Sequence, residues 1–169
     1  GLTGLINGAL STDIYLHDTY FIVGHFHYVM FGGTGFALFA GLLYWLPKIT
    51  GRMYKKKPIW ISWGFLFVGF NMLYFSMLVL GWQGMPRRYY DFLPQFESLN
   101  VVATVGSWFL VAGLIFFFGT LIRSIKHGEP AGPNPWGGTT LEWQTPSPPP
   151  HENFLKPPLV PGIDPFEQR

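Results

Sequence analysis

The chain contains no cysteine and little charge for its length. Only 12% of its 169 residues are Asp, Glu, Lys or Arg, whereas an average soluble domain carries about 25%. The absence of cysteine excludes disulfide bonds, thiolate zinc sites and iron–sulfur clusters. Because 49% of the residues are hydrophobic and 19% are aromatic, the low charge argues against a soluble domain and indicates a membrane protein.

The charge deficit is concentrated in three stretches without any Asp, Glu, Lys or Arg. These stretches are residues 19–47, 58–86 and 98–122. Crossing the hydrocarbon core of a membrane takes about 20 predominantly apolar residues, and each stretch is longer than that. The sequence therefore predicts an all-α membrane protein with three transmembrane helices.

The two ends of the chain differ from these stretches. The apolar, small-residue start at Gly1 predicts the end of a preceding helix, and the missing initiator Met indicates a fragment or one product of a split gene. After Gly128 lie 11 of the 15 prolines, which favours irregular or polyproline structure. We therefore predict transmembrane helices in residues 1–127 and a Pro-rich extramembrane tail in residues 128–169. The tail is expected to lie over a partner surface or to be partly disordered.

Basic residues predict the orientation in the membrane. Cytoplasmic or matrix-side loops collect Lys and Arg, and two segments are rich in them, so both segments and the tail are predicted on that side. The residues concerned are Lys48, Arg52, Lys55, Lys56, Lys57, Arg123 and Lys126. Arg87 and Arg88 fall on the opposite side, against this rule, and therefore require a specific partner.

Two histidines lie inside the first apolar stretch, separated by Phe26. Each residue of an α-helix turns the chain by about 100°, so His25 and His27 point to nearly opposite sides. They cannot chelate one ion, but each can ligate a different metal centre. Haem iron takes axial histidine, and ionisable side chains inside membrane helices are usually functional. The alternative is that both histidines make hydrogen bonds to neighbouring helices.

His17 and Asp18 lie near the start of the same stretch, with Asp13 four residues before His17. Adjacent imidazole and carboxylate groups can together hold a divalent cation such as Mg²⁺ or Mn²⁺. The alternative is a polar cluster at a helix N-terminus in which Asp18 lies near the cap. The residues alone leave both interpretations open.

Arg87 and Arg88 follow the second apolar stretch. Adjacent guanidinium groups repel each other unless an anion lies beside them, and their planar forks pair well with carboxylates. Haem propionates are carboxylates, and they fit this depth because His25 and His27 lie about 9–12 Å into the first span. Lipid phosphate or an acidic residue of a partner are the alternative anions.

These motifs together resemble the haem–copper oxidase family, in its cytochrome c oxidase subunit I branch. The resemblance runs along essentially the whole chain, and Asp18 and Tyr28 favour the branch that oxidises cytochrome c over the branch that oxidises quinol. The residues that carry it are His17-Asp18-Thr19-Tyr20, His25-Phe26-His27-Tyr28, Gly84-Met85-Pro86-Arg87-Arg88, Thr140-Leu141-Glu142-Trp143 and Pro148-Pro149-Pro150.

The resemblance implies a role for each candidate residue. His25 would be the proximal ligand of the high-spin haem at which oxygen reacts, and His27 an axial ligand of the low-spin haem. His17 and Asp18 would bind Mg²⁺ or Mn²⁺ near the interface with subunit II. The residues implied to contact haem propionates are Asp13, Arg87 and Arg88.

The resemblance also implies that this chain is part of a larger subunit of about twelve helices. The copper ligands and the second low-spin haem ligand would then lie outside the chain, and the piece alone is expected to be inactive. The complete enzyme would transfer electrons from cytochrome c through the low-spin haem to a haem–copper centre, reduce oxygen to water and pump protons. Two haems are implied, with type A favoured although axial ligands alone do not determine the type.

The partners implied by the resemblance are the remaining helices of subunit I, subunits II and III, cytochrome c as electron donor, and the lipid membrane; no nucleic acid is expected. The location would be a bacterial plasma membrane or a mitochondrial inner membrane, with the tail on the cytoplasmic or matrix side. Two other functions remain open from the sequence. One is a small membrane haem protein that transfers electrons, and the other is a non-catalytic assembly piece of a split subunit.

Overall fold

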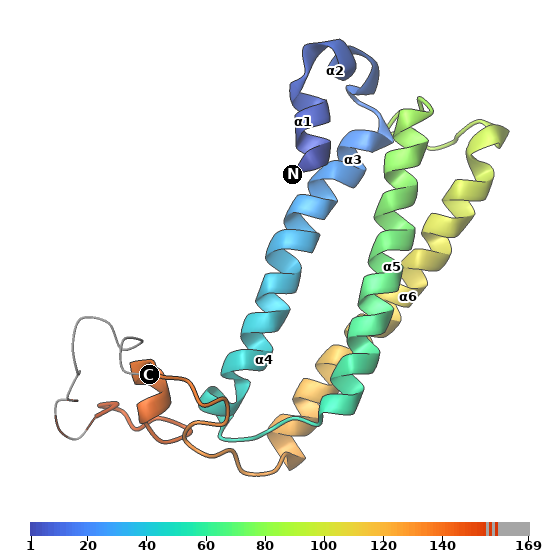
Figure 1. The fold of residues 1–169 in the computed structure, drawn as a ribbon. Helices are drawn as coiled ribbons and strands as arrows, with labels where there is room; N and C mark the ends of the chain where they lie inside the picture. The colour runs from blue at the N-terminus through green and yellow to red at the C-terminus, as the bar shows by residue number, and fades with distance from the viewer. Residues whose placement is uncertain (155, 157, 159–169) are drawn as a thin grey trace. The chain divides into compact units, whose positions relative to one another are not determined.

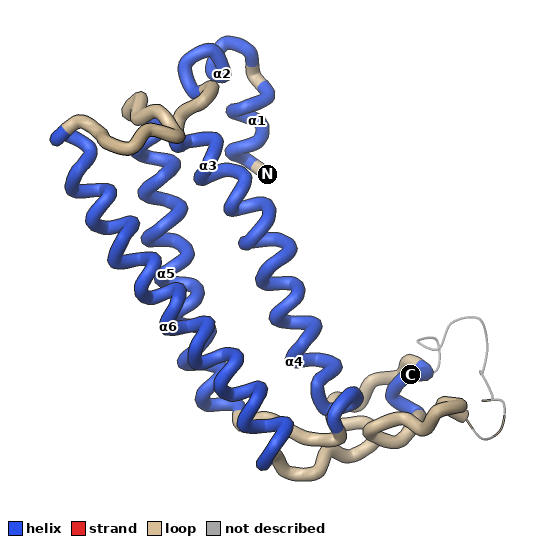
Figure 2. Tube along the Cα trace, turned by 180° about the vertical axis from the view of Figure 1, so that it is seen from behind, coloured by secondary structure: helices blue, strands red, loops and turns tan. Residues whose placement is uncertain are grey.

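The computed structural model describes residues 1–154, 156 and 158, so the last part of the predicted tail lies outside the described residues. The described residues form helices and loops, without a strand (Figure 2). Three helical segments are long and apolar enough to cross a membrane, and these are Tyr20–Thr50, Lys56–Trp82 and Pro94–His127. The predicted all-α membrane architecture with three transmembrane helices is confirmed.

The chain begins with a short helix, Leu2–Gly8. Contacts group the chain into two compact units, the first formed by Gly1–Phe39 with Lys57–Phe118, and the second by Ala40–Lys56 with the described chain from Gly119 onward. The elements in order are α1 (Leu2–Gly8), α2 (Leu10–Leu16), α3 (Tyr20–His27), the π-helical η1 (Tyr28–Gly35), α4 (Phe36–Thr50), α5 (Lys56–Trp82), η2 (Pro94–Phe96), α6 (Glu97–His127) and η3 (Leu141–Gln144) (Figure 1).

The turn between α2 and α3 is set by Asp18 and Thr19. Asp18 has a φ of 59°, in the left-handed region that Asp adopts more readily than most residues. Thr19 is the N-cap of α3, because its hydroxyl oxygen accepts a hydrogen bond from the Phe21 amide at 3.2 Å. The cap therefore belongs to Thr19 and leaves the Asp18 carboxylate free to make other contacts.

In the first unit, α5 packs closely on both α3 and α6, and the contacts are made at glycines. A Cβ at Gly81 would lie 1.8 Å from the backbone nitrogen of Phe21, and a Cβ at Gly69 would lie 2.7 Å from the carbonyl oxygen of Gly106. Small residues let helix backbones approach each other inside a membrane, where close packing rather than exclusion from water drives helix association. These contacts fix α3 against α5 close to the residues predicted to be functional.

The same unit also contains an aromatic core. Its buried members come from α5 and α6, and aromatic side chains of η1 and α4 pack against them. Their ring planes are mostly tilted or perpendicular, the arrangement that aromatic quadrupoles favour. The buried residues are Leu66, Phe70, Tyr74 and Leu110, and the half-buried aromatic residues around them are Tyr28, Phe31, Phe36 and Phe39.

In the second unit, the first part of the tail packs on the end of α4. Trp143 is 2% exposed, and its Nε1 donates a hydrogen bond to the hydroxyl oxygen of Tyr44 at 2.9 Å. Lys48 is 6% exposed, and its Nζ donates to the carbonyl oxygens of Pro133 and Thr145, both at 2.7 Å. Lys48 therefore lies in the last turn of α4, beneath the tail.

Candidate functional site

Helix α3 directs its two histidines toward different elements. The ring of His27 stacks on the ring of Tyr74 in α5, with the centroids 4.3 Å apart. The Nδ1 atom of His25 is joined to Thr3 Oγ1 in α1 by a hydrogen bond of 2.7 Å. A spacing of two helical residues corresponds to a rotation of about 200°, and the two side chains accordingly contact different neighbours.

Both histidines keep the same nitrogen available for a metal. His27 Nδ1 lies 2.8 Å from the carbonyl oxygen of Val23, so this nitrogen carries the proton and donates. In His25 it is again Nδ1 that is engaged, with Thr3. Within the described residues, neither Nε2 atom makes a hydrogen bond. Metal-ligating histidines usually engage the second ring nitrogen with a carbonyl, carboxylate or water, so the surroundings of both rings fit axial ligation of haem iron.

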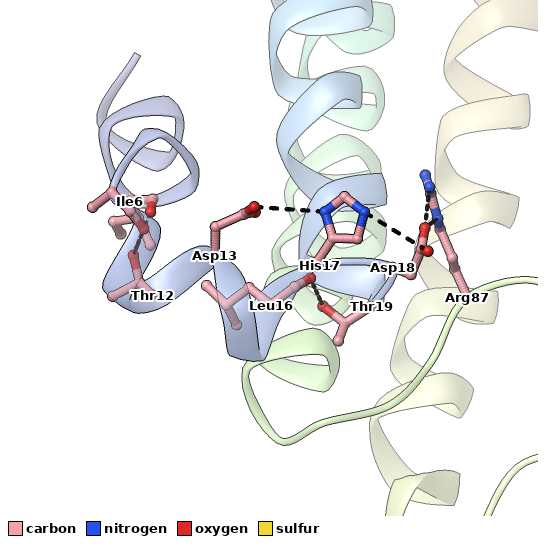
Figure 3. Close-up of polar contacts among 9 residues, drawn as sticks. Ile6, Thr12, Asp13, Leu16, His17, Asp18, Thr19 and Arg87 are labelled. Atoms are coloured by element: carbon pink, nitrogen blue, oxygen red, sulfur yellow. Dashed lines mark hydrogen bonds and ion pairs between the residues drawn. The ribbon is translucent and has the colours of Figure 1, made fainter.

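Asp18 and Arg87 are 69 positions apart in the sequence, and the fold brings them together (Figure 3). The Tyr20 amide donates to the carbonyl oxygen of Met85 at 3.0 Å, and the Arg87 amide donates to that of Asp18 at 2.9 Å. These backbone contacts align the side chains, so that Arg87 Nε donates to Asp18 Oδ1 at 2.8 Å. A terminal guanidinium nitrogen of Arg87 contacts the same oxygen. A carboxylate of the same chain is therefore one anionic partner of the arginine pair.

The contact with Arg87 also favours the charged form of the Asp18 carboxyl group. The hydrogen bond from Arg87 holds the pKa of the Asp18 carboxyl below its usual value, and the positive charges of Arg87 and Arg88 act in the same direction. The ion pair is thus complete above the ordinary carboxyl pKa and is lost as the pH falls through the lowered pKa. Because the Asp18 side chain is 59% exposed, the pair stabilises the fold little, and its main effect is to position the two groups.

His17 lies between Asp13 and Asp18 (Figure 3). Its Nδ1 is 3.6 Å from Asp13 Oδ2, and its Nε2 is 3.9 Å from Asp18 Oδ2. Two ligand atoms that each lie about 2.1 Å from an octahedral Mg²⁺ are about 3.0 Å apart in neighbouring positions, so His17 and Asp18 are close but would have to move nearer to each other to share an ion. Over the described part of the chain, no group of three or more His, Cys, Asp or Glu residues could hold a metal. Such an ion would need water or another chain for its remaining ligands.

The predicted propionate contacts are positioned unequally. Arg87 is only 21% exposed and is held by Asp18, whereas Arg88 is exposed with a φ of 70°. Arg88 makes no hydrogen bond or ion pair with any described residue. Asp13 is half-buried and faces His17. Of the three residues, Arg88 is therefore the exposed one that has no hydrogen bond or ion pair with the described residues.

Two polar residues of this region were not identified from the sequence. Tyr74 is the ring on which His27 stacks. Asn71, one turn earlier on α5, accepts a hydrogen bond from the hydroxyl group of Tyr28 at 2.9 Å. The available signal was a polar side chain inside an apolar stretch, because such groups are costly there and usually have partners.

Comparison with known proteins places this chain in a described family. The family model for cytochrome c and quinol oxidase polypeptide I matches residues 1–121. A cytochrome c oxidase subunit 1 from Synechocystis sp. is 46% identical over 160 residues, which are 95% of this chain and 29% of that protein. The corresponding protein from Bacillus subtilis is 42% identical over 169 residues, with 98% of this chain and 27% of that protein covered.

A solved structure of a haem–copper terminal oxidase dimer has a similar fold. It matches with a TM-score of 0.64 and 26% sequence identity, over 73% of this chain and 24% of the solved chain. The chain thus spans less than a third of the length of the relatives that it matches.

Proposed function

The chain belongs to the cytochrome c and quinol oxidase polypeptide I family, and on this basis we propose that it supplies haem ligands to a respiratory terminal oxidase. The observation that carries the proposal is the pair of histidines in α3, which contact different elements and both keep Nε2 available. His25 is proposed as the proximal ligand of the high-spin haem, where oxygen reacts. His27 is proposed as one axial ligand of the low-spin haem.

When bound, the haems and the copper supply the electron transfer and the reduction of oxygen to water, coupled to proton pumping. The chain's own residues hold and orient these groups. The Val23 carbonyl fixes the protonated nitrogen of His27, which keeps its Nε2 lone pair available to a metal. His25 and His27 share one rigid helix, with Phe26 between them, so the distance between the two ligated groups is set by the backbone.

The second part of the proposal concerns the outer loops. His17 and Asp18 are proposed ligands of Mg²⁺ or Mn²⁺, supported by the closeness of Nε2 and Oδ2, which lie 3.9 Å apart. Arg87, Arg88 and Asp13 are proposed to lie at the haem propionates. The ion pair between Asp18 and Arg87 joins the two sites, so the charge at one of them acts directly on the other.

We further propose which partners the chain contacts and how it is placed in the membrane. The apolar residues of α1 and α2 are largely exposed, with Leu2 at 80% and Leu10 at 75%, and a surface of this kind fits contact with the remaining helices of subunit I and with lipid. The other proposed partners are subunits II and III, with cytochrome c as the electron donor because the named relatives are cytochrome c oxidases. Residues 1–127 would form the membrane domain and residues 128–169 a tail on the cytoplasmic or matrix side.

The proposal is tested by the haem content of the assembled oxidase. With His25→Ala and His27→Ala combined, we expect both haems to be lost, because each iron loses a protein ligand, and extracted pyridine haemochrome measures the loss. The matched control is His127→Ala, at the exposed end of α6, which should keep both haems. If the double variant accumulates in membranes with unchanged haem content, neither histidine is a ligand and the proposal is wrong.

Arg87→Gln is expected to lower the midpoint potential of the low-spin haem. Ferric haem carries one more positive charge than ferrous haem, so a nearby guanidinium favours the reduced form, and its removal also leaves the charge of Asp18 uncompensated. A charge interaction of about 1 kcal/mol corresponds to roughly 40 mV for one electron. A redox titration of the assembled variant measures the shift. Arg123→Gln, in the last part of α6, is the control, and an equal shift in both variants would contradict a local effect.

A further inference from the structure

Among the described residues, the ring of His27 contacts three groups, and one of them is the ring of Phe26, tilted by 30° with the centroids 4.6 Å apart. One edge is fixed because Nδ1 donates to the Val23 carbonyl at 2.8 Å. One face is covered by Tyr74 of α5, with the ring centroids 4.3 Å apart and the ring planes only 14° from parallel. A single hydrogen bond leaves the imidazole free to tilt about the N–H···O axis. A parallel ring against its face removes that freedom.

The ring of Tyr74 is itself held in place by the residues packed around it. Its side chain is 8% exposed and belongs to the buried core of the first unit. The ring of Phe70 packs against it at 5.1 Å and 63°, and the ring of Phe31 lies 6.4 Å away at 43°. Closely packed interiors hold side chains in single rotamers. The plane of the Tyr74 ring is therefore fixed by the fold, and it can impose an orientation on His27.

The hydroxyl group of Tyr74 does not account for this contact. Within the described part of the chain it makes no hydrogen bond, whereas the hydroxyl group of Tyr28 in the same core donates to Asn71 at 2.9 Å. His25 offers a second contrast, because its imidazole contacts a threonine hydroxyl and stacks on no aromatic ring of the described residues. The contact between Tyr74 and His27 is therefore made by the two ring faces and does not involve the Tyr74 hydroxyl group.

We propose that Tyr74 is a positioning residue that fixes the plane of the His27 imidazole. Through this orientation it would influence the g values and the reduction potential of the haem that His27 ligates. This inference rests on the proposed function, in which His27 is an axial ligand of the low-spin haem. The orientation of an axial imidazole determines how its π orbitals overlap with the iron d orbitals. That overlap sets the g values of a low-spin ferric haem, and it contributes to the reduction potential. The contribution of Tyr74 comes from its planar ring and not from its hydroxyl group.

The test compares Tyr74→Phe with Tyr74→Leu in the assembled oxidase. Phenylalanine keeps the planar ring, whereas leucine keeps apolar volume but has no flat face to stack on an imidazole. Low-temperature electron paramagnetic resonance of the oxidised enzyme reads the g values, and a redox titration reads the midpoint potential. We expect Tyr74→Phe to match the parent in both measurements. Tyr74→Leu is expected to shift or broaden the low-spin signal and to move the potential, with the haem still bound.

The remaining outcomes separate this inference from the proposed function. If His27→Ala removes the low-spin signal but Tyr74→Leu leaves the g values and the potential unchanged, the positioning role is wrong and the ligand assignment stands. If the signal survives His27→Ala, both are wrong. A change in Tyr74→Phe equal to that in Tyr74→Leu would assign the effect to the hydroxyl group and overturn the inference. Should Tyr74→Leu fail to accumulate, Tyr74→Met is measured in its place, because its unbranched side chain adapts to irregular cavities.

Discussion

Replacing His25 with alanine is expected to abolish oxygen reduction by the assembled oxidase while leaving the low-spin haem signal in place. The reason is geometric, because His25 contacts α1 and His27 contacts α5, so the loss of one ligand leaves the surroundings of the other intact. Oxygen consumption should fall to the level of membranes without the oxidase. A reduced-minus-oxidised spectrum of the same membranes should lose only the high-spin component.

His27→Ala is the reciprocal experiment. It should remove the low-spin component and keep the high-spin component, and electron delivery to the oxygen site should stop because the proposed route passes through the low-spin haem. A matching loss of both components in each single variant would show that the two side chains support one common centre. That result would contradict the assignment of separate ligands to the two sides of α3.

Gly81→Ala is expected to prevent the accumulation of folded protein. The added Cβ would lie 1.8 Å from the backbone nitrogen of Phe21 and 2.5 Å from its Cα, and backbone atoms cannot move aside as a flexible side chain can. The cost should exceed about 3 kcal/mol, the upper end of the usual penalty for overpacking. The amount of the protein in detergent-extracted membranes and its thermal unfolding measure the effect.

Gly64→Ala is the matched control for this experiment. Gly64 lies on the same helix, α5, and a Cβ there would meet nothing within 4 Å. Since alanine is favoured over glycine in a helix by roughly 0.5–1 kcal/mol, the control should accumulate normally and be slightly more stable. Normal accumulation of Gly81→Ala would mean that α3 and α5 are not packed backbone to backbone.

The three membrane helices were predictable because absence of charge over a long stretch is a local property of the sequence. Their ends were less predictable. The second uncharged stretch runs to Pro86, but α5 ends at Trp82, since the chain turns at Gly84 with a φ of 89°. The first stretch stops at Pro47, yet α4 continues to Thr50 and includes the buried Lys48. Charge marks where a helix can leave the membrane core and does not mark where its hydrogen bonds end.

Part of the candidate site could be predicted from the sequence for the same reason. The opposed directions of His25 and His27 follow from the helical period alone, and the two side chains do contact different elements. The need of Arg87 for an anion also followed from its charge, but the identity of that anion did not. The metal role of Asp18 was one of two interpretations of the residues and was implied by the resemblance, and no local pattern links Asp18 to a residue 69 positions later.

By itself, the sequence determined the membrane class, the three helices and the two-sided placement of the histidines. These properties depend on composition and on the fixed geometry of one helix, which act over a few residues. The tertiary structure alone decided that Asp18 pairs with Arg87, that Tyr74 covers the face of His27, and that the tail buries Lys48. Each of these contacts joins residues far apart in the chain, so it exists only once turns and helix packing have brought two distant surfaces together.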